Sequence, residues 1–210
     1  MYVSKHISRL IQYRQILINF NDLGLKTVFS YNIGKEAGVT AEQVRKDFSR
    51  FGIKGNKKGG YDVNVLLFTI NEIFRKDKLQ KVVLVGLGHI GRALMNYKGF
   101  RKNMIQIVAA FDIDPAKYRK KYDIQVYPNE MMNRVITDLG IRVAVVTVPE
   151  RVAQEVVNQL VDAGIIGILN FTPAILKVPE HVIISNIRIG NALETLIYEI
   201  NKVEAGKPAH

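Results

Sequence analysis

The sequence contains no cysteine and no tryptophan, and none of its apolar runs approaches the roughly 18 to 20 residues of a membrane-spanning helix. Without cysteine there is no disulfide, no thiolate nucleophile and no cysteine-based zinc site. The four histidines are scattered and give no pattern of metal ligands. The first ten residues, MYVSKHISRL, lack the apolar core of a signal peptide. These absences predict a cytoplasmic protein with no metal and no membrane partner.

Positive charge is concentrated in the N-terminal part of the chain. The 210 residues carry a formal net charge of +11. Residues 1–80 contain 14 Lys and Arg against 7 Asp and Glu, a net +7, while residues 81–210 contain 16 against 12, a net +4. This asymmetry indicates a polyanionic partner for the N-terminal part, with nucleic acid considered first and an acidic membrane surface second.

The N-terminal part has the pattern of a helix-turn-helix. Residues 5–20 have apolar side chains at helical spacing, and a second, short helix is expected over Ile33–Ala37. Gly38-Val39 predicts a turn, and the capping-box pattern from Thr40 to Gln43 opens a third helix. Two short helices joined by a glycine-containing turn form this motif.

The third helix has the composition of a DNA-recognition helix. Glutamine and arginine side chains suit the edges of bases, and lysine suits phosphates. A basic, glycine-rich loop over Gly52–Tyr61 follows, and we interpret it as the hairpin wing of a winged helix. A solvated basic helix and loop is the alternative, but helix-turn-helix, wing and charge excess coincide. The predicted DNA contacts are Gln43, Arg45, Lys46, Arg50, Lys54, Lys57 and Lys58.

A glycine motif dominates the second part of the chain. The apolar run Val82–Val85 ends at Gly86, and Gly88 and Gly91 complete G-x-G-x-x-G before a predicted helix. This strand, turn and helix is the context of a dinucleotide fingerprint, in which the helix N-terminus faces the pyrophosphate. The intervening residues Leu87, His89 and Ile90 belong to the same predicted phosphate loop.

An acidic residue supports this interpretation. The apolar run Ile105–Phe111 ends at Asp112, which lies 21 residues after Gly91 and is followed by Ile113. At this spacing a carboxylate hydrogen-bonds the adenine ribose 2′-OH and repels a 2′-phosphate, which favours NAD(H) over NADP(H). The alternative is a glycine turn in an α/β sheet that binds nothing.

Strands and helices continue to alternate beyond Asp112, which predicts an α/β fold with a parallel sheet and right-handed crossovers. The expected organisation is a winged-helix DNA-binding domain (1–80), a Rossmann-like domain (81–186), and a C-terminal helix and tail (187–210). Ligands of such sheets bind at the carboxyl ends of the strands. The candidate residues there are Val148, Pro149, Phe171, Thr172 and Pro173.

Several stretches together resemble the Rex family of redox-sensing transcriptional repressors over nearly the whole chain. The most specific are Gln43–Asp47 (QVRKD), the glycine motif and Gly167–Phe171 (GILNF). The resemblance implies a homodimer that exchanges its C-terminal helices and binds a palindromic double-stranded DNA operator. It further implies that NADH releases the DNA, that Arg45 and Lys46 face the operator, and that Tyr97, Phe171 and Pro173 lie near the nicotinamide.

The chain departs from the family at positions linked to the redox switch. The family usually has aspartate at the position of Arg188, where it pairs with the tyrosine matching Tyr97 or with an N-terminal arginine that aligns with Gln15. Thr172 replaces alanine and Arg50 replaces tyrosine. A DNA-binding regulator with an altered redox response, or with another nucleotide effector such as CoA, is therefore the alternative.

A small NAD-dependent dehydrogenase is the other class considered. Tyr198 and Lys202 have the Y-x-x-x-K spacing of short-chain dehydrogenases, but a chance surface pair is by far the better explanation, since the pair lies at the extreme C-terminus without an obvious serine partner. About 130 residues (81–210) hold the cofactor, which leaves no separate substrate domain. We therefore predict a regulator without catalytic residues.

Overall fold

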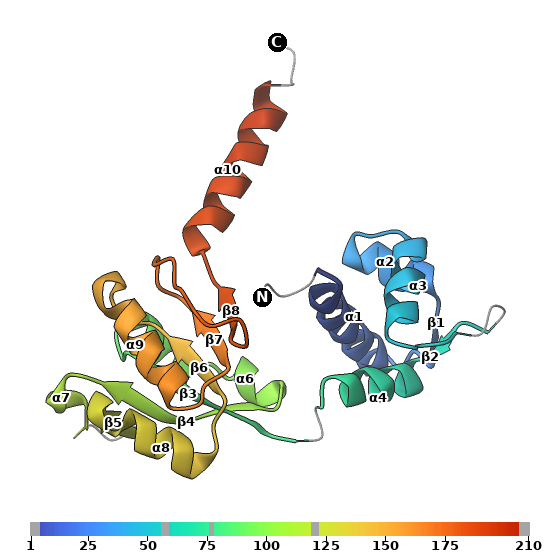
Figure 1. Ribbon diagram of the computed structural model, residues 1–210. Helices are drawn as coiled ribbons and strands as arrows, with labels where there is room; N and C mark the ends of the chain where they lie inside the picture. The colour runs from blue at the N-terminus through green and yellow to red at the C-terminus, as the bar shows by residue number, and fades with distance from the viewer. Residues whose placement is uncertain (1–4, 56–58, 76–77, 119–121, 206–210) are drawn as a thin grey trace. The chain divides into compact units, whose positions relative to one another are not determined.

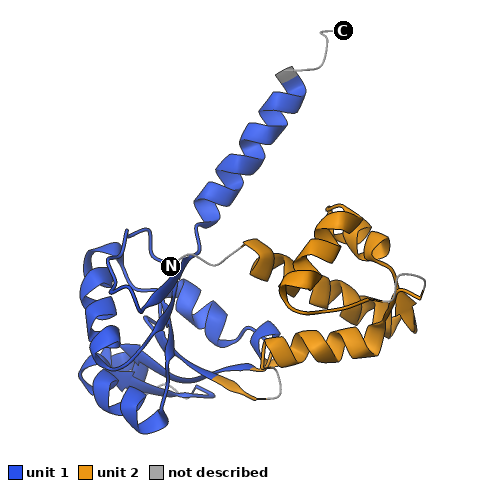
Figure 2. Cartoon of the chain, turned by 45° about the vertical axis from the view of Figure 1, so that its right-hand side comes forward, with its two compact units in different colours: residues 1–2, 81–100, 105–210 blue, residues 3–80, 101–104 orange. Residues whose placement is uncertain are grey.

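The described chain forms two compact units (Figure 2). The computed structural model describes residues 5–55, 59–75, 78–118 and 122–205. The N-terminal unit reaches Gln80 and also includes Arg101–Met104. The second unit contains Lys81–Phe100 and the residues from Ile105 onward. No helix in the described ranges is long and apolar enough to cross a membrane.

The N-terminal unit consists of four helices and a small antiparallel sheet (Figure 1). The helices are α1 (Lys5–Asp22), α2 (Ser30–Ala37), α3 (Ala41–Arg50) and α4 (Val63–Ile73), and the strands are β1 (Thr27–Val28) and β2 (Tyr61–Asp62). The predicted helix-turn-helix is confirmed, with α2 and α3 joined at Gly38, whose φ of +68° suits glycine.

One detail of this unit differs from the sequence-based expectations. Helix α2 begins at Ser30 rather than Ile33, because the Asn32 side chain accepts a hydrogen bond from the Phe29 N–H and extends the first turn. The wing predicted over Gly52–Tyr61 is described only at its two ends, where Gly52 and Gly60 have positive φ and β2 pairs with β1. The hairpin pairing within this loop stays a prediction, because residues 56–58 lie outside the described residues.

A buried ion pair joins α1 to the recognition helix α3. The Asp47 carboxylate, which is fully buried, accepts two hydrogen bonds from Arg9 (2.6 and 2.7 Å) and one from the Tyr13 hydroxyl (2.9 Å). Burial raises the pKa of Asp47, but these hydrogen bonds outweigh it, so the net pKa is lower than usual. Gln43 donates to the same carboxylate over 2.9 Å. The predicted capping box is therefore only half formed: Thr40 accepts the Gln43 N–H, while the Gln43 side chain binds Asp47.

The second unit is a six-stranded sheet in the order β5-β4-β3-β6-β7-β8. The pairs β4–β5, β3–β6, β6–β7 and β7–β8 are parallel. The strands are β3 (Gln80–Val85), β4 (Ile105–Asp112), β5 (Gln125–Pro128), β6 (Val143–Val146), β7 (Gly167–Asn170) and β8 (Ile183–Asn186). The chain leaves β3 toward β4 on one side and later returns to β6 on the other. This order confirms the predicted Rossmann-like fold and places a crevice at the carboxyl ends of β3 and β6.

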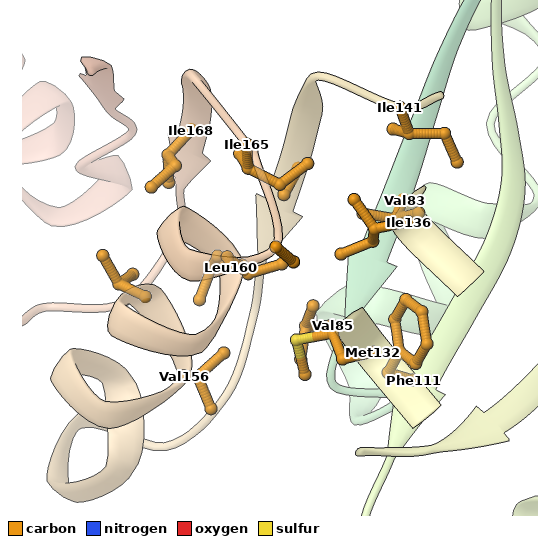
Figure 3. Packing of buried hydrophobic residues seen from close by; sticks show 14 of the residues in the cluster. Val83, Val85, Phe111, Met132, Ile136, Ile141, Val156, Leu160, Ile165 and Ile168 are labelled. Carbon is orange, nitrogen blue, oxygen red and sulfur yellow. The ribbon is translucent and has the colours of Figure 1, made fainter. Parts of the chain in front are cut away.

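Helices cover both faces of this sheet, and their bounds are α5 (His89–Met95), α6 (Gly99–Lys102), α7 (Pro115–Tyr118), the 3₁₀ helix η1 (Asn129–Met131), α8 (Met132–Leu139) and α9 (Glu150–Asp162). The last helix, α10 (Ile189–Ala205), extends away from the sheet (Figure 1). Alternate residues of β3 point to opposite faces, so Val83 and Val85 pack against α8 and α9 (Figure 3), and Leu84 lies in the cluster that includes α5. The predicted helix over 128–139 is divided into η1 and α8, and α6 is an element that the sequence pattern did not indicate.

Replacing Asp47 tests the buried ion pair. We expect Asp47→Ala to lower the free energy of unfolding of the N-terminal unit by about 2 to 3 kcal/mol at pH 7, since Arg9 and Tyr13 lose their partner but Arg9 stays partly solvated. The Asp47 pKa is lower in the folded state than in the unfolded state. The ionised carboxylate therefore stabilises the fold above pH ~4, and this stabilisation is lost as the pH falls further. Urea unfolding followed by circular dichroism at pH 7 and pH 3 measures both effects.

An exposed ion pair provides the control. Arg134 and Asp138 on α8 lie 3.7 Å apart with side chains 78% and 66% exposed. Asp138→Ala should change stability by less than about 0.5 kcal/mol at either pH. An equal loss of unfolding free energy in Asp47→Ala and Asp138→Ala would contradict a larger stabilising effect of the buried Asp47 ion pair.

Candidate functional sites

The glycine motif forms a tight connection between β3 and α5. Gly86 has φ +94°, and a Cβ there would lie 3.0 Å from the backbone of Thr147. A Cβ on Gly91 would lie 2.0 Å from the Gly86 carbonyl oxygen, so the helix packs directly on the loop. Gly88 has open space beside it. The first and third glycines are therefore required by packing, and the second leaves room for a ligand to approach the backbone.

The Asp112 carboxylate fastens this loop to the end of β4. It is 6% exposed, and its Oδ2 accepts hydrogen bonds from the Leu87 N–H (2.6 Å) and from Lys117 Nζ (2.8 Å). Its Oδ1 accepts the Asp114 N–H (3.0 Å). Burial raises the pKa of Asp112, but the bonds from Lys117 and the two backbone groups outweigh it and leave the pKa below its usual value. The carboxylate is thus ionised at neutral pH and occupies three of its roughly four acceptor positions.

A cavity of about 580 Å³ opens beside this carboxylate. Six of the residues predicted from the sequence line it together: Gly86, Gly88, Asp112, Ile113, Val148 and Pro149. Sequence reasoning missed its other main lining residues: Lys117, Asn129, Glu130, Thr147, Val152, Glu155 and Gln159. Only Lys117 had a usable signal, as a basic residue five positions after Asp112 at the end of β4. The size suits part of a nucleotide ligand, with apolar walls and a few polar groups.

Other predicted dinucleotide contacts lie outside the lining of this cavity. Leu87 is buried, while Ile90 and His89 are exposed on α5. Tyr97 is 59% exposed and its ring packs edge-on against Phe100. The remaining predicted residues, Phe171, Thr172 and Pro173, form the loop after β7.

Arg188 holds the loop after β7. Its guanidinium donates hydrogen bonds to the carbonyl oxygens of Thr172 and of Ala174, the latter over 2.9 Å. The buried Asn170 amide donates to Asn186 Oδ1 over 2.8 Å and accepts the Thr172 N–H over 2.9 Å. Since Arg188 directly precedes α10, this network ties the loop to the start of that helix. The other predicted switch residue, Gln15, is exposed and contacts Asn19 (3.4 Å).

The recognition helix presents a basic surface. Arg45, Lys46 and Arg50 are exposed, while Val44 and Phe48 on the opposite side are buried in the core. Arg45 donates to the Ser30 hydroxyl (3.0 Å) at the start of α2, and Arg50 lies 3.4 Å from His6 Nδ1. Lys54 is exposed in the wing loop. The predicted contacts Lys57 and Lys58 lie outside the described residues, and Gln43 is half-buried against Asp47.

The described residues contain no group of three or more His, Asp or Glu side chains that could hold a metal ion.

Two family descriptions match the chain: "CoA binding domain" over residues 77–174 and "Putative DNA-binding protein N-terminus" over residues 4–49. These matches correspond to the Rossmann-like fold and to the helix-turn-helix.

Curated relatives match nearly the full length. The redox-sensing transcriptional repressor Rex of Oenococcus oeni is 40% identical over 207 residues, covering 96% of this chain and 94% of the relative. That of Halalkalibacterium halodurans is 40% identical over 192 residues, covering 90% of each.

Solved structures of a Rex-family repressor are also similar to this chain. The repressor is RSP, and its complex with NAD⁺ and operator DNA is 33% identical to this chain in sequence. The two structures align with a TM-score of 0.90 over 97% of this chain and 94% of RSP. Its NADH complex has a TM-score of 0.86 and covers 97% and 96%. Sequence and fold agree with one assignment: the chain belongs to the Rex family of redox-sensing transcriptional repressors.

Proposed function

We propose that this protein is a cytoplasmic DNA-binding repressor whose affinity for a palindromic operator is set by NADH or NAD⁺ in the Rossmann-like unit. The observation that carries the proposal is the coexistence in one chain of a basic recognition helix and a glycine-loop cavity with an ionised Asp112. RSP, which shares the fold, was solved with operator DNA and NAD⁺ and with NADH. The dinucleotide acts here as a signal rather than a reactant, and no residue is assigned a catalytic role.

The dinucleotide pyrophosphate would lie over Gly88, where the backbone is accessible, and the adenine ribose at Asp112. The nicotinamide half would reach toward the loop after β7 and Tyr97. Lys117, bound to the same carboxylate, partly offsets the negative charge that would repel a 2′-phosphate.

Helix α10 supports the proposed homodimer. All of its described side chains are exposed in the single chain. Its apolar residues recur at intervals of three and four and form one stripe: Ile189, Leu193, Leu196, Ile197, Ile200 and Val203. An amphipathic helix with an uncovered stripe of this length is stabilised by burial against a partner, and a second copy of the chain supplies an identical stripe.

Operator binding tests the DNA-binding half of the proposal. Arg45→Ala should weaken binding to a palindromic duplex, selected from a random pool by the wild-type protein, by roughly 1 to 3 kcal/mol. NADH affinity should stay unchanged. Fluorescence anisotropy at two salt concentrations measures the effect, with the exposed Arg134→Ala as matched control. Full operator affinity in Arg45→Ala would exclude this residue from the interface.

Ligand titration tests the sensor half. Asp112→Ala should weaken NADH binding by roughly 1.5 to 3 kcal/mol, since a charged acceptor is lost and the Leu87 N–H is left unpaired. Discrimination against NADPH should decrease in the same variant. Calorimetric titration with NADH, NAD⁺, NADPH and CoA measures both, and Asp138→Ala is the control. Unchanged NADH affinity would contradict the ribose contact, and tighter binding of CoA than of NADH would favour a CoA-responsive regulator.

The redox response is tested at Arg188. We expect Arg188→Ala to raise the NADH concentration needed for half-release of the operator by at least about threefold, because the loop after β7 loses its hydrogen bonds to Thr172 and Ala174. Operator binding against NADH at fixed NAD⁺ measures this, alongside Arg188→Asp and the exposed control Lys177→Ala. An unchanged half-point would show that Arg188 takes no part in the switch.

A further inference from the structure

The short helix α6 joins the two compact units through the chain itself (Figure 2). Its first two residues, Gly99 and Phe100, belong to the Rossmann-like unit, and its last two belong to the segment Arg101–Met104, which is part of the N-terminal unit. The helix is a single turn of four residues. Because one helical turn contains no joint, we expect a displacement of its first residues to displace its last residues as well.

The start of α6 is fixed from the side of the ligand site. Helix α5 packs directly on the glycine loop at Gly91 and leads to Tyr97. The Tyr97 ring covers Gly99, where a Cβ would lie 2.5 Å from the ring. The Phe100 ring meets the Tyr97 ring edge-on with centroids 5.1 Å apart, and the Phe100 N–H donates to the Tyr97 carbonyl oxygen over 3.3 Å. The position of α6 therefore follows that of Tyr97.

The end of α6 is fixed from the N-terminal unit by Arg14 of α1. The Arg14 guanidinium donates one hydrogen bond to Asn103 Oδ1 (3.3 Å) and one to Asn71 Oδ1 of α4 (2.6 Å). Met104, the next residue, has a φ of +55°, which is uncommon outside glycine, and its carbonyl oxygen accepts the Gln80 N–H over 2.8 Å. The chain after α6 is thus held in one defined conformation.

The two hydrogen bonds of Arg14 differ in strength. None of the ion pairs in the described ranges includes Arg14, which is half-buried and binds only neutral amide oxygens. A neutral acceptor holds a guanidinium less strongly than a carboxylate such as Asp47 holds Arg9. The bond to Asn103 is also the longer of the two. It can therefore break while the bond to Asn71 keeps Arg14 in place.

We propose that residues 97–103 couple the dinucleotide site to the DNA-binding unit, with Arg14 as the positioning residue that receives the change. A ligand that displaces Tyr97 displaces α6, and the hydrogen bond between Asn103 and Arg14 is made in one state of the protein and broken in the other. This inference rests on the proposed function, in which the nicotinamide half of NAD(H) reaches toward Tyr97.

Helix α1 connects Arg14 to the recognition helix. Arg9, on the same helix, donates two hydrogen bonds to Asp47 of α3. A displacement of α1 therefore reaches α3 through a buried ion pair. This connection leads to the DNA-binding surface and does not pass through Arg188 and α10.

The factor by which saturating NADH changes operator affinity measures this coupling. Asn103→Leu in the full-length protein has a similar volume but accepts no hydrogen bond. It should keep operator affinity without NADH, and NADH affinity without operator, within about twofold, while the coupling factor falls at least about threefold, the scale of one net hydrogen bond. Arg14→Leu should lower the factor similarly, and the double variant should lower it no further, since all three variants remove the same bond.

Asn133→Leu is the matched control, because Asn133 is exposed on α8 and absent from the lining of the dinucleotide cavity. It should keep the wild-type coupling factor. Fluorescence anisotropy of a labelled operator and the fluorescence of the dihydronicotinamide give the dissociation constants. Circular dichroism verifies folding, and Asn103→Ala carries the same expectation if the leucine variant is unfolded.

The outcomes separate this inference from the proposed function. A coupling factor that stays at the wild-type value in Asn103→Leu would overturn the role of Asn103 and leave the proposed function intact. The same holds if this variant loses affinity for operator or NADH but keeps the factor, since the bond would then be only structural. Operator binding by wild type that does not respond to NADH would overturn both the proposed redox response and this inference.

Discussion

The ionised Asp112 carboxylate is the interaction on which the ligand site depends. Leu87 is the one residue of the Gly86–Gly88 loop that has a side chain, and its N–H would be an unpaired buried donor without this acceptor. Lys117 makes the buried charge tolerable by donating to the same oxygen. Loop, strand end and helix α7 are thus held by one carboxylate, which leaves about one acceptor position for a ribose hydroxyl. The same group therefore builds the site and, in the proposed function, also binds the ligand.

The fold and the glycine side of the site could be predicted from the sequence because their causes are local. The third glycine of G-x-G-x-x-G is required by a contact within a few residues, as the short distance from a Gly91 Cβ to the Gly86 carbonyl oxygen shows. Apolar runs of four to eight residues mark buried strands in any parallel sheet. Asn129 and Gln159 had no such signal. They reach the cavity only because β5 lies beside β4 and α9 packs over the sheet, and a single sequence does not contain that register.

In the recognition helix, the polarity of a side chain does not by itself predict whether that side chain is exposed. Gln43 and Arg45 are both polar residues on α3, and composition alone assigns both to DNA. The structure separates them: Arg45 is exposed, whereas Gln43 donates to a buried carboxylate that also binds Arg9. Asp47 lies on the same helix face as Val44 and Phe48, but its charge alone would assign it to the surface, and its hydrogen bonds to Arg9 and Tyr13 of α1 explain its burial. Exposure predicted from the sequence pattern is therefore wrong for polar residues whose hydrogen-bond partners lie far away in the sequence.

A sensor differs from an enzyme in what its ligand must accomplish. Regulation requires the ligand to bind two states of the protein with different affinity, and a state-independent contact changes nothing however strong it is. In the proposed site Asp112 contacts the adenosine half, which NADH and NAD⁺ share, so this contact supplies affinity but no redox discrimination. Discrimination must arise at the nicotinamide half. In the proposed function the nicotinamide half lies at the loop after β7, which is hydrogen-bonded to Arg188 at the start of α10. A change in that loop would then reach α10, the helix that we propose for the dimer interface, through these hydrogen bonds.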